Sequence, residues 1–348
     1  MQNDTTNTLF TASPESARLI ILYQFSHKDF AIRLEEQLRL FHWEHSSYIY
    51  LQLASELSNS DDLLKLIVPA IENKIPIFLV ADQSSHLETI LKAFRYLNHP
   101  FIYTSISEKP DDIKYLFNIS NTVPNFEEPL ISNLMRYDAI GFQIHQMNPA
   151  LLDSLEDTSS RVYRLGQLKE NIKETEPILR DSHLTHMQLS VLKHSEAPAQ
   201  LFPNQSGICS EEACQLVRYA GISDKLQSLA ITGFDPDKDN DGRTTNVIAQ
   251  LIWYAADGVM NRRRDHPDQG PSMAHYTIES EILSDDLIFI KSEKTGRWWL
   301  KNPFASDEDP DIHRFFPCSY QDYLMACEGE ISDNLLKAQL WFSKMLLK

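Results

Sequence analysis

One stretch about two thirds of the way along the chain has part of the spacing of a calcium-binding loop. It runs from residue 235 to residue 242 and reads DPDKDNDG. The residues that match positions 1, 3, 5 and 6 of an EF-hand loop are Asp237, Asp239, Asp241 and Gly242. Position 12, which supplies a bidentate glutamate in such loops, is Ile248. The alternative is a loop before a helix, with its acids facing the positive helix end and Thr244 or Thr245 near the cap.

Histidines supply a second candidate for metal chemistry, because the neutral imidazole is a common metal ligand. His145 follows a predicted strand, and His186 lies within another. One hypothesis is a replacement metal site that uses both of them. His183 lies three residues before His186 and therefore points to the other face of the strand. Ordinary polar histidines are the competing interpretation, and no serine has a recognisable nucleophile motif.

The elements that must position these residues alternate between short apolar runs and amphipathic stretches. Strands are predicted at 18–23, 48–53, 75–80, 101–106, 137–144, 161–165, 184–189 and 226–232. Helices are predicted at 30–41, 61–73, 86–97, 148–156, 170–180, 211–220 and 244–260. A strand, a loop and a helix repeated many times indicate an α/β fold with a mostly parallel sheet and helices on both faces.

The chain divides into three predicted parts. Residues 1–16 are polar and form a loose N-terminus. Residues 17–267 form the α/β domain, in which 107–133 is a long irregular segment. Residues 268–348 form a small C-terminal α+β extension that packs on this domain. Its expected elements are antiparallel strands near 276–281, 287–291 and 297–300 and helices near 320–327 and 335–347.

Composition limits the class of protein. The chain has 348 residues, of which 42% are hydrophobic and 23% charged, so it can bury a substantial core. Its net charge of -17 repels nucleic acid and anionic membranes. No apolar run approaches the length of a membrane span, and the N-terminus lacks the basic and apolar regions of a signal peptide. Four cysteines without a zinc or disulfide pattern indicate a cytoplasmic protein with reduced thiols.

Binding sites in open α/β sheets gather at the carboxyl ends of the strands. Here the predicted ends are rich in amides and hydroxyls and poor in the histidines and carboxylates that bind metals or move protons. These ends are the segments 82–84, 105–108, 143–145, 188–190 and 233–235. Three charged residues elsewhere, Glu176, Arg180 and Asp181, are predicted to form exposed ion pairs of small energetic value.

The acidic loop belongs to a longer run that ends in an apolar helix. In this run Gly233-Phe234-Asp235-Pro236 precedes Asp239, Thr244 and the helix to Gly258. Other motifs are Tyr163-Arg164-Leu165-Gly166, Arg297-Trp298-Trp299 and Pro317-Cys318-Ser319-Tyr320. On these motifs, over roughly residues 135–330, the chain resembles the arginase/ureohydrolase family, which includes agmatinases and formiminoglutamases. The likeness is to a bacterial arginase-like branch with a C-terminal extension.

The resemblance implies a three-layer α/β/α fold and two manganese ions that bridge a hydroxide, which attacks a guanidinium or formimino carbon. The ligands would come from three strand ends. On the family's pattern these ends fall at Asp82-Gln83-Ser84, near 103–107, and at Gln188-Leu189-Ser190. The acid that holds the substrate's cationic group falls at Gly233. Hard divalent cations need anionic oxygens or imidazoles, so these neutral residues predict that the metal site is absent.

The resulting hypothesis is an arginase-fold protein that has lost its manganese site and hydrolase activity and acts as a binding or interaction module. No cofactor is expected, and the partner would be a protein or a small polar ligand; a homo-oligomer is also compatible with the sequence. One alternative is an active ureohydrolase with relocated ligands, which would use manganese to hydrolyse C–N bonds. Another is a sensor that holds a neutral polar ligand in the remnant cleft. The residues of this cleft are Asp82, Gln83, Ser84, Gln188, Ser190, Gly233 and Asp235.

Overall fold

The computed structural model describes residues 9–24, 28–53, 60–82, 87–97, 101–107, 135–146, 149, 153, 159–268, 272–279, 286–309 and 314–346. Two predicted segments, 107–133 and the helix 148–156, lie almost entirely outside these residues.

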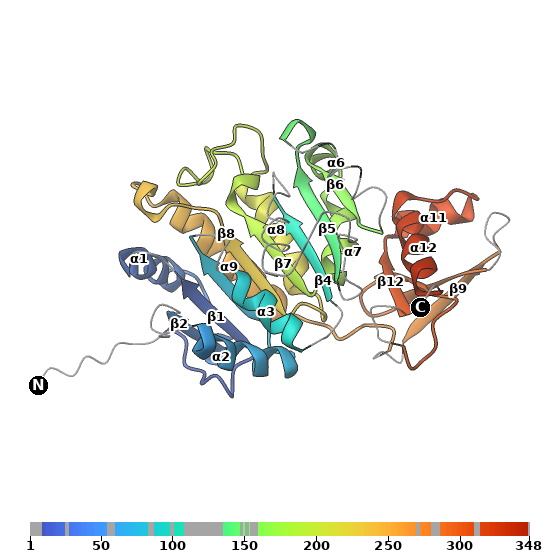
Figure 1. The fold of residues 1–348 in the computed structure, drawn as a ribbon, viewed down its shortest axis with the longest axis horizontal. Coiled ribbons are helices and arrows are strands. Elements are labelled where there is room, and N and C mark those ends of the chain that lie inside the picture. The colour runs from blue at the N-terminus through green and yellow to red at the C-terminus, as the bar shows by residue number, and fades with distance from the viewer. Residues whose placement is uncertain are drawn as a thin grey trace, which may run out of the picture.

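An eight-stranded sheet forms the centre of the molecule (Figure 1). Its strands lie in the order β2-β1-β3-β8-β7-β4-β5-β6, and all neighbouring pairs are parallel. The bounds are β1 Leu19–Gln24, β2 Ile49–Leu53, β3 Ile77–Ala81, β4 Phe101–Ile106, β5 Met135–Phe142, β6 Val162–Arg164, β7 Leu184–Gln188 and β8 Ser228–Thr232. Each of these strands lies at a predicted apolar run, and the strands pair in parallel. The predicted parallel α/β architecture is therefore confirmed.

Helices cover both faces of this sheet, as a strand that is apolar on both sides requires. Alternate residues of β1 illustrate the two cores: Leu19 and Ile21 pack with α1, α8 and α9, whereas Ile20 and Leu22 pack with α2 and α3. The bounds are α1 Lys28–Arg39, α2 Ser60–Glu72, α3 Glu88–Tyr96, α6 Leu165–Glu170, α7 Glu176–Asp181, α8 Ser210–Gly221 and α9 Arg243–Met260. None of the helices in the described residues is long and apolar enough to cross a membrane.

The C-terminal extension has a core of its own. Four antiparallel strands lie in the order β12-β11-β10-β9, and two helices cover one side of them. The bounds are β9 Met273–Ile278, β10 Leu287–Ser292, β11 Trp298–Lys301, β12 Phe315–Cys318, α11 Tyr320–Cys327 and α12 Asp333–Leu346. The predicted small antiparallel set and terminal helices are confirmed, whereas strand β12 was not predicted. The extension lies at one end of the main sheet in Figure 1.

A buried cluster of charges joins the extension to the edge of the main sheet where β5, β6 and β7 begin. Asp181 accepts hydrogen bonds from Arg136 at 2.5 Å and Arg161 at 3.2 Å through Oδ2, and from Lys225 at 3.0 Å through Oδ1. Both guanidinium groups lie over the ring of Phe316 in β12, at 5.2 and 4.9 Å from its centroid. The extension therefore covers the sheet where β5, β6 and β7 begin, at the edge opposite to their carboxyl ends.

The prediction of exposed ion pairs was wrong for two of its three residues. Arg180 is 5% exposed and Asp181 is 1% exposed. The Arg180 guanidinium donates hydrogen bonds to the carbonyl oxygens of Trp298 at 3.1 Å and Cys318 at 3.2 Å, and it also pairs with Glu176. The physical reason is that the groups which bury Arg180 lie in the extension, more than one hundred residues later in the chain.

Candidate functional site

The candidate site lies at the carboxyl edge of the central strands. Because β3, β8, β7 and β4 are consecutive and parallel in the sheet, their carboxyl ends meet at one edge. Asp82 follows β3, Gly233 follows β8, Gln188 ends β7, and Ser107 follows β4. The strand order thus gathers residues that are up to 151 positions apart in the sequence, as predicted for this edge.

Gln188 is the centre of a buried hydrogen-bond network. Its Oε1 accepts hydrogen bonds from the hydroxyl of Ser107 at 2.7 Å and from the hydroxyl of Ser190 at 3.1 Å. All three residues are at most 6% exposed. Ser107 was not selected from the sequence, although it lies in the strand end 105–108. Its register beside β7 was the missing information, since only neighbouring parallel strands place Ser107 next to Gln188.

Gly233 has no side chain, and this leaves room for the side chain of Gln188. Its φ of +87° is in the region that L side chains rarely adopt, and a Cβ at this position would lie 2.7 Å from Cγ of Gln188. Its N–H donates to the carbonyl oxygen of Asp82, as does the N–H of Phe234, each at 3.2 Å. The position where the family pattern has an acid is therefore covered by an amide side chain.

The other predicted residues of the cleft have different environments. Asp82 is 3% exposed, and its main-chain carbonyl oxygen accepts the hydrogen bonds from Gly233 and Phe234 after β8. Gln83 and Ser84 lie outside the described residues. Asp235 is half-buried; its carboxylate accepts a hydrogen bond from the N–H of Asp237 at 3.1 Å and pairs with Lys238 at 3.1 Å. Asp235 thus caps the short turn Pro236–Lys238.

The acidic loop is organised around the start of α9. Asp239 is 2% exposed, and its two oxygens accept hydrogen bonds from the N–H groups of Thr244 and Thr245, both at 2.9 Å. Asp241 is exposed and pairs with Arg243 at 2.6 Å, and Asp237 is also exposed. These contacts match the alternative interpretation of a helix-start loop, in which a carboxylate satisfies the first helical N–H groups.

The two histidines of the replacement-site hypothesis lie in different environments. His186 is fully buried in β7; its Nδ1 is 2.8 Å from the hydroxyl of Tyr103, and its Nε2 is 2.8 Å from the hydroxyl of Thr232. His145 is exposed in the short helix Ile144–Gln146 after β5. With both ring nitrogens of His186 engaged by hydroxyls, the ring has no nitrogen turned toward a ligand.

The side chains that the structure describes at this edge do not fit a pair of manganese ions. Across the described residues, no group of three or more His, Cys, Asp and Glu side chains lies close enough together to hold a metal ion. At the ends of β7 and β4 the oxygens belong to a neutral amide and two hydroxyls that already bond one another. Manganese in such sites is held by carboxylates and imidazoles, so this donor set disagrees with the metal that the fold family implies.

A pH-dependent loss of stability is expected from His186. Burial lowers the pKa of this imidazole from 6.5 to about 4. Between these values the unfolded chain binds a proton that the folded chain does not, so stability is lost as pH falls from 6.5 towards 4. At pH 5 the loss relative to pH 8 is about 2 kcal/mol. Urea unfolding at pH 8 and at pH 5 measures the drop in the free energy of unfolding between these two pH values. This drop should be about 2 kcal/mol smaller in His186→Gln than in the wild type.

The matched control for this prediction is His145→Gln, because that imidazole lies at the surface. It should retain the wild-type dependence of unfolding free energy on pH. An unchanged dependence in His186→Gln would contradict the assignment of a neutral, buried imidazole.

Comparisons with known proteins show similarity in fold without detectable similarity in sequence. No model of a protein family matches the chain, and no curated protein matches it either. A solved structure of agmatine ureohydrolase from Thermoplasma volcanium superposes with a TM-score of 0.53 at 13% identity, covering 71% of this chain and 92% of that chain.

Two formiminoglutamase structures give similar values. The enzyme from Trypanosoma cruzi, solved with Mn2+, has a TM-score of 0.57 at 15% identity and covers 73% of this chain and 98% of its own. Formimidoylglutamase from Bacillus subtilis has a TM-score of 0.56 at 12% identity and covers 75% of this chain and 94% of its own. Identity this low carries information on the fold alone, and the arginase-like fold predicted from the sequence motifs is confirmed.

Proposed function

We propose that this chain is an arginase-fold protein without metal-dependent hydrolase activity, which acts as a binding or interaction module. The observation that carries the proposal is the arrangement of Gln188, whose amide oxygen accepts hydrogen bonds from Ser107 and Ser190 at the strand ends where the family pattern has metal ligands. An amide oxygen that accepts two hydroxyl protons is satisfied without a cation. A neutral hydrogen-bond network thus replaces the expected charged ligands.

The electrostatics of the site support the same proposal. Two divalent ions at this edge would need several anionic ligands to compensate their charge in a buried environment. Asp82 is the buried carboxylate among the described strand ends, because Asp235 is half-buried and already paired with Lys238. Hydrolysis by a metal-bound hydroxide requires the metal to lower the pKa of that water. One buried carboxylate among the described strand ends is too few ligands for two such ions, which supports a protein without this reaction.

The proposal includes the chemistry and the location of the binding role. Amide and hydroxyl groups can donate and accept hydrogen bonds, which suits a small polar ligand without net charge. A cytoplasmic location is supported by four cysteines that form no disulfide. A thermal-shift screen against amino acids and guanidino compounds separates a small-molecule ligand from a protein partner, since only the former raises the melting temperature of the isolated chain.

Metal analysis of the purified chain tests the proposal. After incubation with excess Mn2+ and desalting, wild-type protein should retain far less than one ion per chain, and it should release neither urea from arginine or agmatine nor formamide from formiminoglutamate. An active ureohydrolase treated in parallel is the control for metal loading and for the assays. About two manganese ions per chain together with hydrolysis would overturn the proposal in favour of an enzyme with relocated ligands.

A further inference from the structure

Arg136, in the second position of β5, is a buried cation whose hydrogen-bond donors are mostly unused. It is 0% exposed, and its Nη2 donates hydrogen bonds to Asp181 at 2.5 Å and to Asp138 at 3.3 Å. Its Nε and Nη1 are also inaccessible to solvent, and neither has a hydrogen-bond partner among the described residues. Buried donors without a partner are rare in native proteins, because each one loses its bonds to water and gains nothing in return. These two nitrogens therefore point to an acceptor that the described residues do not supply.

The carboxylates nearest to Arg136 are already shared with other cations. Asp181 also accepts hydrogen bonds from Arg161 at 3.2 Å and from Lys225 at 3.0 Å. Asp138 accepts from the main-chain N–H of Arg161 at 2.8 Å and from its Nη2 at 2.7 Å. Two carboxylates thus serve three cations at this place. Their negative charge is divided, so Arg136 receives only part of the compensation that a buried guanidinium needs.

Aromatic rings of the extension form the wall beside this guanidinium. Its Cζ lies 5.2 Å from the ring centroid of Phe316 in β12 and 5.3 Å from that of Trp341 in α12. Both rings are buried. An aromatic face attracts a cation through its quadrupole, but it brings no negative charge. The rings also keep bulk water away, and a charge-assisted hydrogen bond is stronger in such a place than in water.

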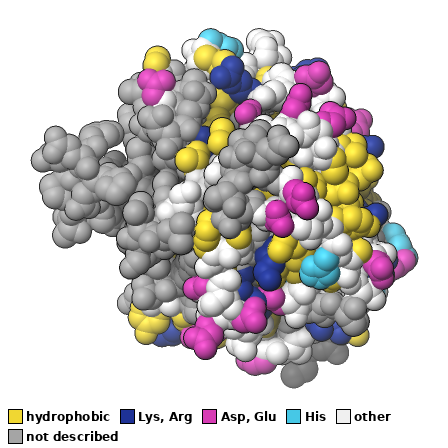
Figure 2. Space-filling view, turned by 90° about the vertical axis from the view of Figure 1, so that its right-hand side faces the viewer, with side chains coloured by type: hydrophobic (Ala, Val, Ile, Leu, Met, Phe, Trp, Pro, Cys, Tyr) yellow, Lys and Arg dark blue, Asp and Glu magenta, His cyan; other side chains and the backbone are white. Residues whose placement is uncertain are grey.

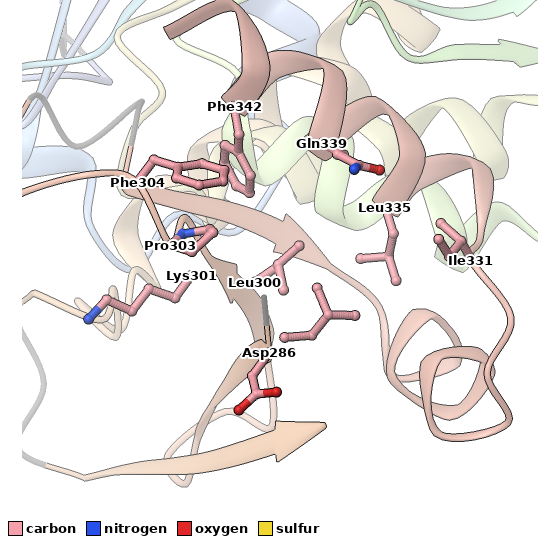
Figure 3. Close-up of a pocket in the computed structure, with 10 residues that line it drawn as sticks. Asp286, Leu300, Lys301, Pro303, Phe304, Ile331, Leu335, Gln339 and Phe342 are labelled. Atoms are coloured by element: carbon pink, nitrogen blue, oxygen red, sulfur yellow. The ribbon is translucent and has the colours of Figure 1, made fainter. Parts of the chain in front are cut away.

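Two other parts of the extension are less suited to hold a small anion. On the face shown in Figure 2, basic side chains lie beside acidic ones, and water screens exposed charges of this kind. The cavity between α12 and the strands β10 and β11 has a mainly apolar lining, with Leu300, Leu335 and Phe342 around it in Figure 3. None of the described residues that line this cavity has a buried polar atom without a partner. Neither part therefore competes with Arg136.

We propose that Nε and Nη1 of Arg136 hold a small monovalent inorganic anion, of the size and charge of chloride, where β5 meets the extension. Such an ion accepts several N–H hydrogen bonds at once and adds the negative charge that the shared carboxylates lack. Water would satisfy the donors but would bring no charge, and a multivalent oxyanion would bring more charge than one guanidinium requires. Because Phe316 and Trp341 belong to the extension, the site exists only in the folded chain. Binding therefore stabilises the folded chain, whether or not the α/β domain is an enzyme.

The dependence of thermal unfolding on chloride tests this site in the full-length protein. The melting temperature should rise by about 2 °C for each tenfold increase in sodium chloride above the dissociation constant. Arg136→Gln removes the donors and leaves two cations for the two carboxylates, so this variant should fold and lose the rise. Sodium gluconate, whose anion is too large for a buried site of this kind, measures the effect of salt in general.

Arg218→Gln is the matched control, because it also removes one arginine from an ion pair. Nε of Arg218 lies 2.9 Å from Oδ2 of Asp257, and the Arg218 side chain is 41% exposed. The melting temperature of this variant should respond to chloride as that of the wild type does. If the wild type and Arg136→Gln respond equally to chloride, relative to gluconate, the proposed anion is wrong and water accepts from these donors.

Anomalous scattering locates the ion in the wild type and decides the question even if Arg136→Gln does not fold. Crystals grown in sodium bromide should show a bromide peak within hydrogen-bond distance of Nε and Nη1 of Arg136. The absence of this peak would overturn the proposal, even if chloride raises the melting temperature. A peak at Arg136 without a rise in the melting temperature would overturn it too, since it would show binding at crystal concentration only.

Discussion

Replacing Asp181 by asparagine is expected to destabilise the fold by about 3–5 kcal/mol. The carboxylate is 1% exposed and accepts hydrogen bonds from Arg136, Arg161 and Lys225. Asparagine keeps the shape of the side chain but removes the charge, which leaves these cations buried with less compensation. Urea unfolding at pH 7 should therefore show a much lower midpoint with the same slope, as expected for a change in stability alone.

The size of this effect depends on burial, and an exposed pair provides the control. Asp62 accepts a hydrogen bond from Lys65 at 2.8 Å, and the side chains are 35% and 76% exposed. Asp62→Asn should cost a fraction of a kcal/mol, because water screens the charges of such a pair. A similar small cost for Asp181→Asn would contradict a buried cluster in which each charge depends on the others.

The dependence of this effect on pH follows from the pKa of Asp181. Burial alone would raise the pKa, but attraction from Lys225, Arg136 and Arg161 outweighs burial and holds it well below the ordinary value of 3.8. The folded pKa is therefore lower than the unfolded one, and the stabilisation is present above pH 3.8 and is lost as pH falls below it. The difference in stability between wild type and Asp181→Asn should accordingly narrow in acid.

This cluster marks the limit of what the sequence could predict about the fold. Apolar runs separated by amphipathic stretches predicted the strands of the main sheet, since each strand is apolar on both faces. The burial of Asp181 and Arg180 could not be predicted in that way. It depends on Phe316, Trp298 and other groups of the extension, and no local pattern shows which distant segment will cover a charge. Strand β12, which supplies Phe316, was not predicted either.

The candidate site was predictable in its residue types and not in its geometry. The rule that sites lie at the carboxyl ends of strands selected Gln188, Ser190 and Gly233 from the sequence. It included Ser107 in the strand end 105–108 but not among the cleft residues, and it did not predict that the hydroxyls would turn towards the amide oxygen of Gln188. Both features depend on the register between β4 and β7, and no local sequence pattern predicts that register. In the structure, Ser107, Gln188 and Ser190 thus form one hydrogen-bonded set at these strand ends.

Gly233→Ala tests whether Gln188 and Gly233 form such a set, with an expected destabilisation of about 2–5 kcal/mol. An L residue at a φ of +87° accounts for about 1–2 kcal/mol. Overpacking against Cγ of Gln188, at 2.7 Å from the new Cβ, adds about 1–3 kcal/mol. The Gln188 side chain cannot swing aside without breaking its hydrogen bonds with Ser107 and Ser190. The free energy of unfolding in urea measures the effect.

Two further variants separate the two contributions. Gly296 has a φ of +77°, and no atom lies within 4 Å of the position that a Cβ would occupy there, so Gly296→Ala should show the backbone strain alone. Gln188→Ala removes the group that a methyl at position 233 would meet. In that background Gly233→Ala should cost about as much as Gly296→Ala, because only the strain of about 1–2 kcal/mol remains. Additive costs for the two changes would mean that Gln188 does not occupy the space above Gly233, and the account of how this site excludes an acid would be wrong.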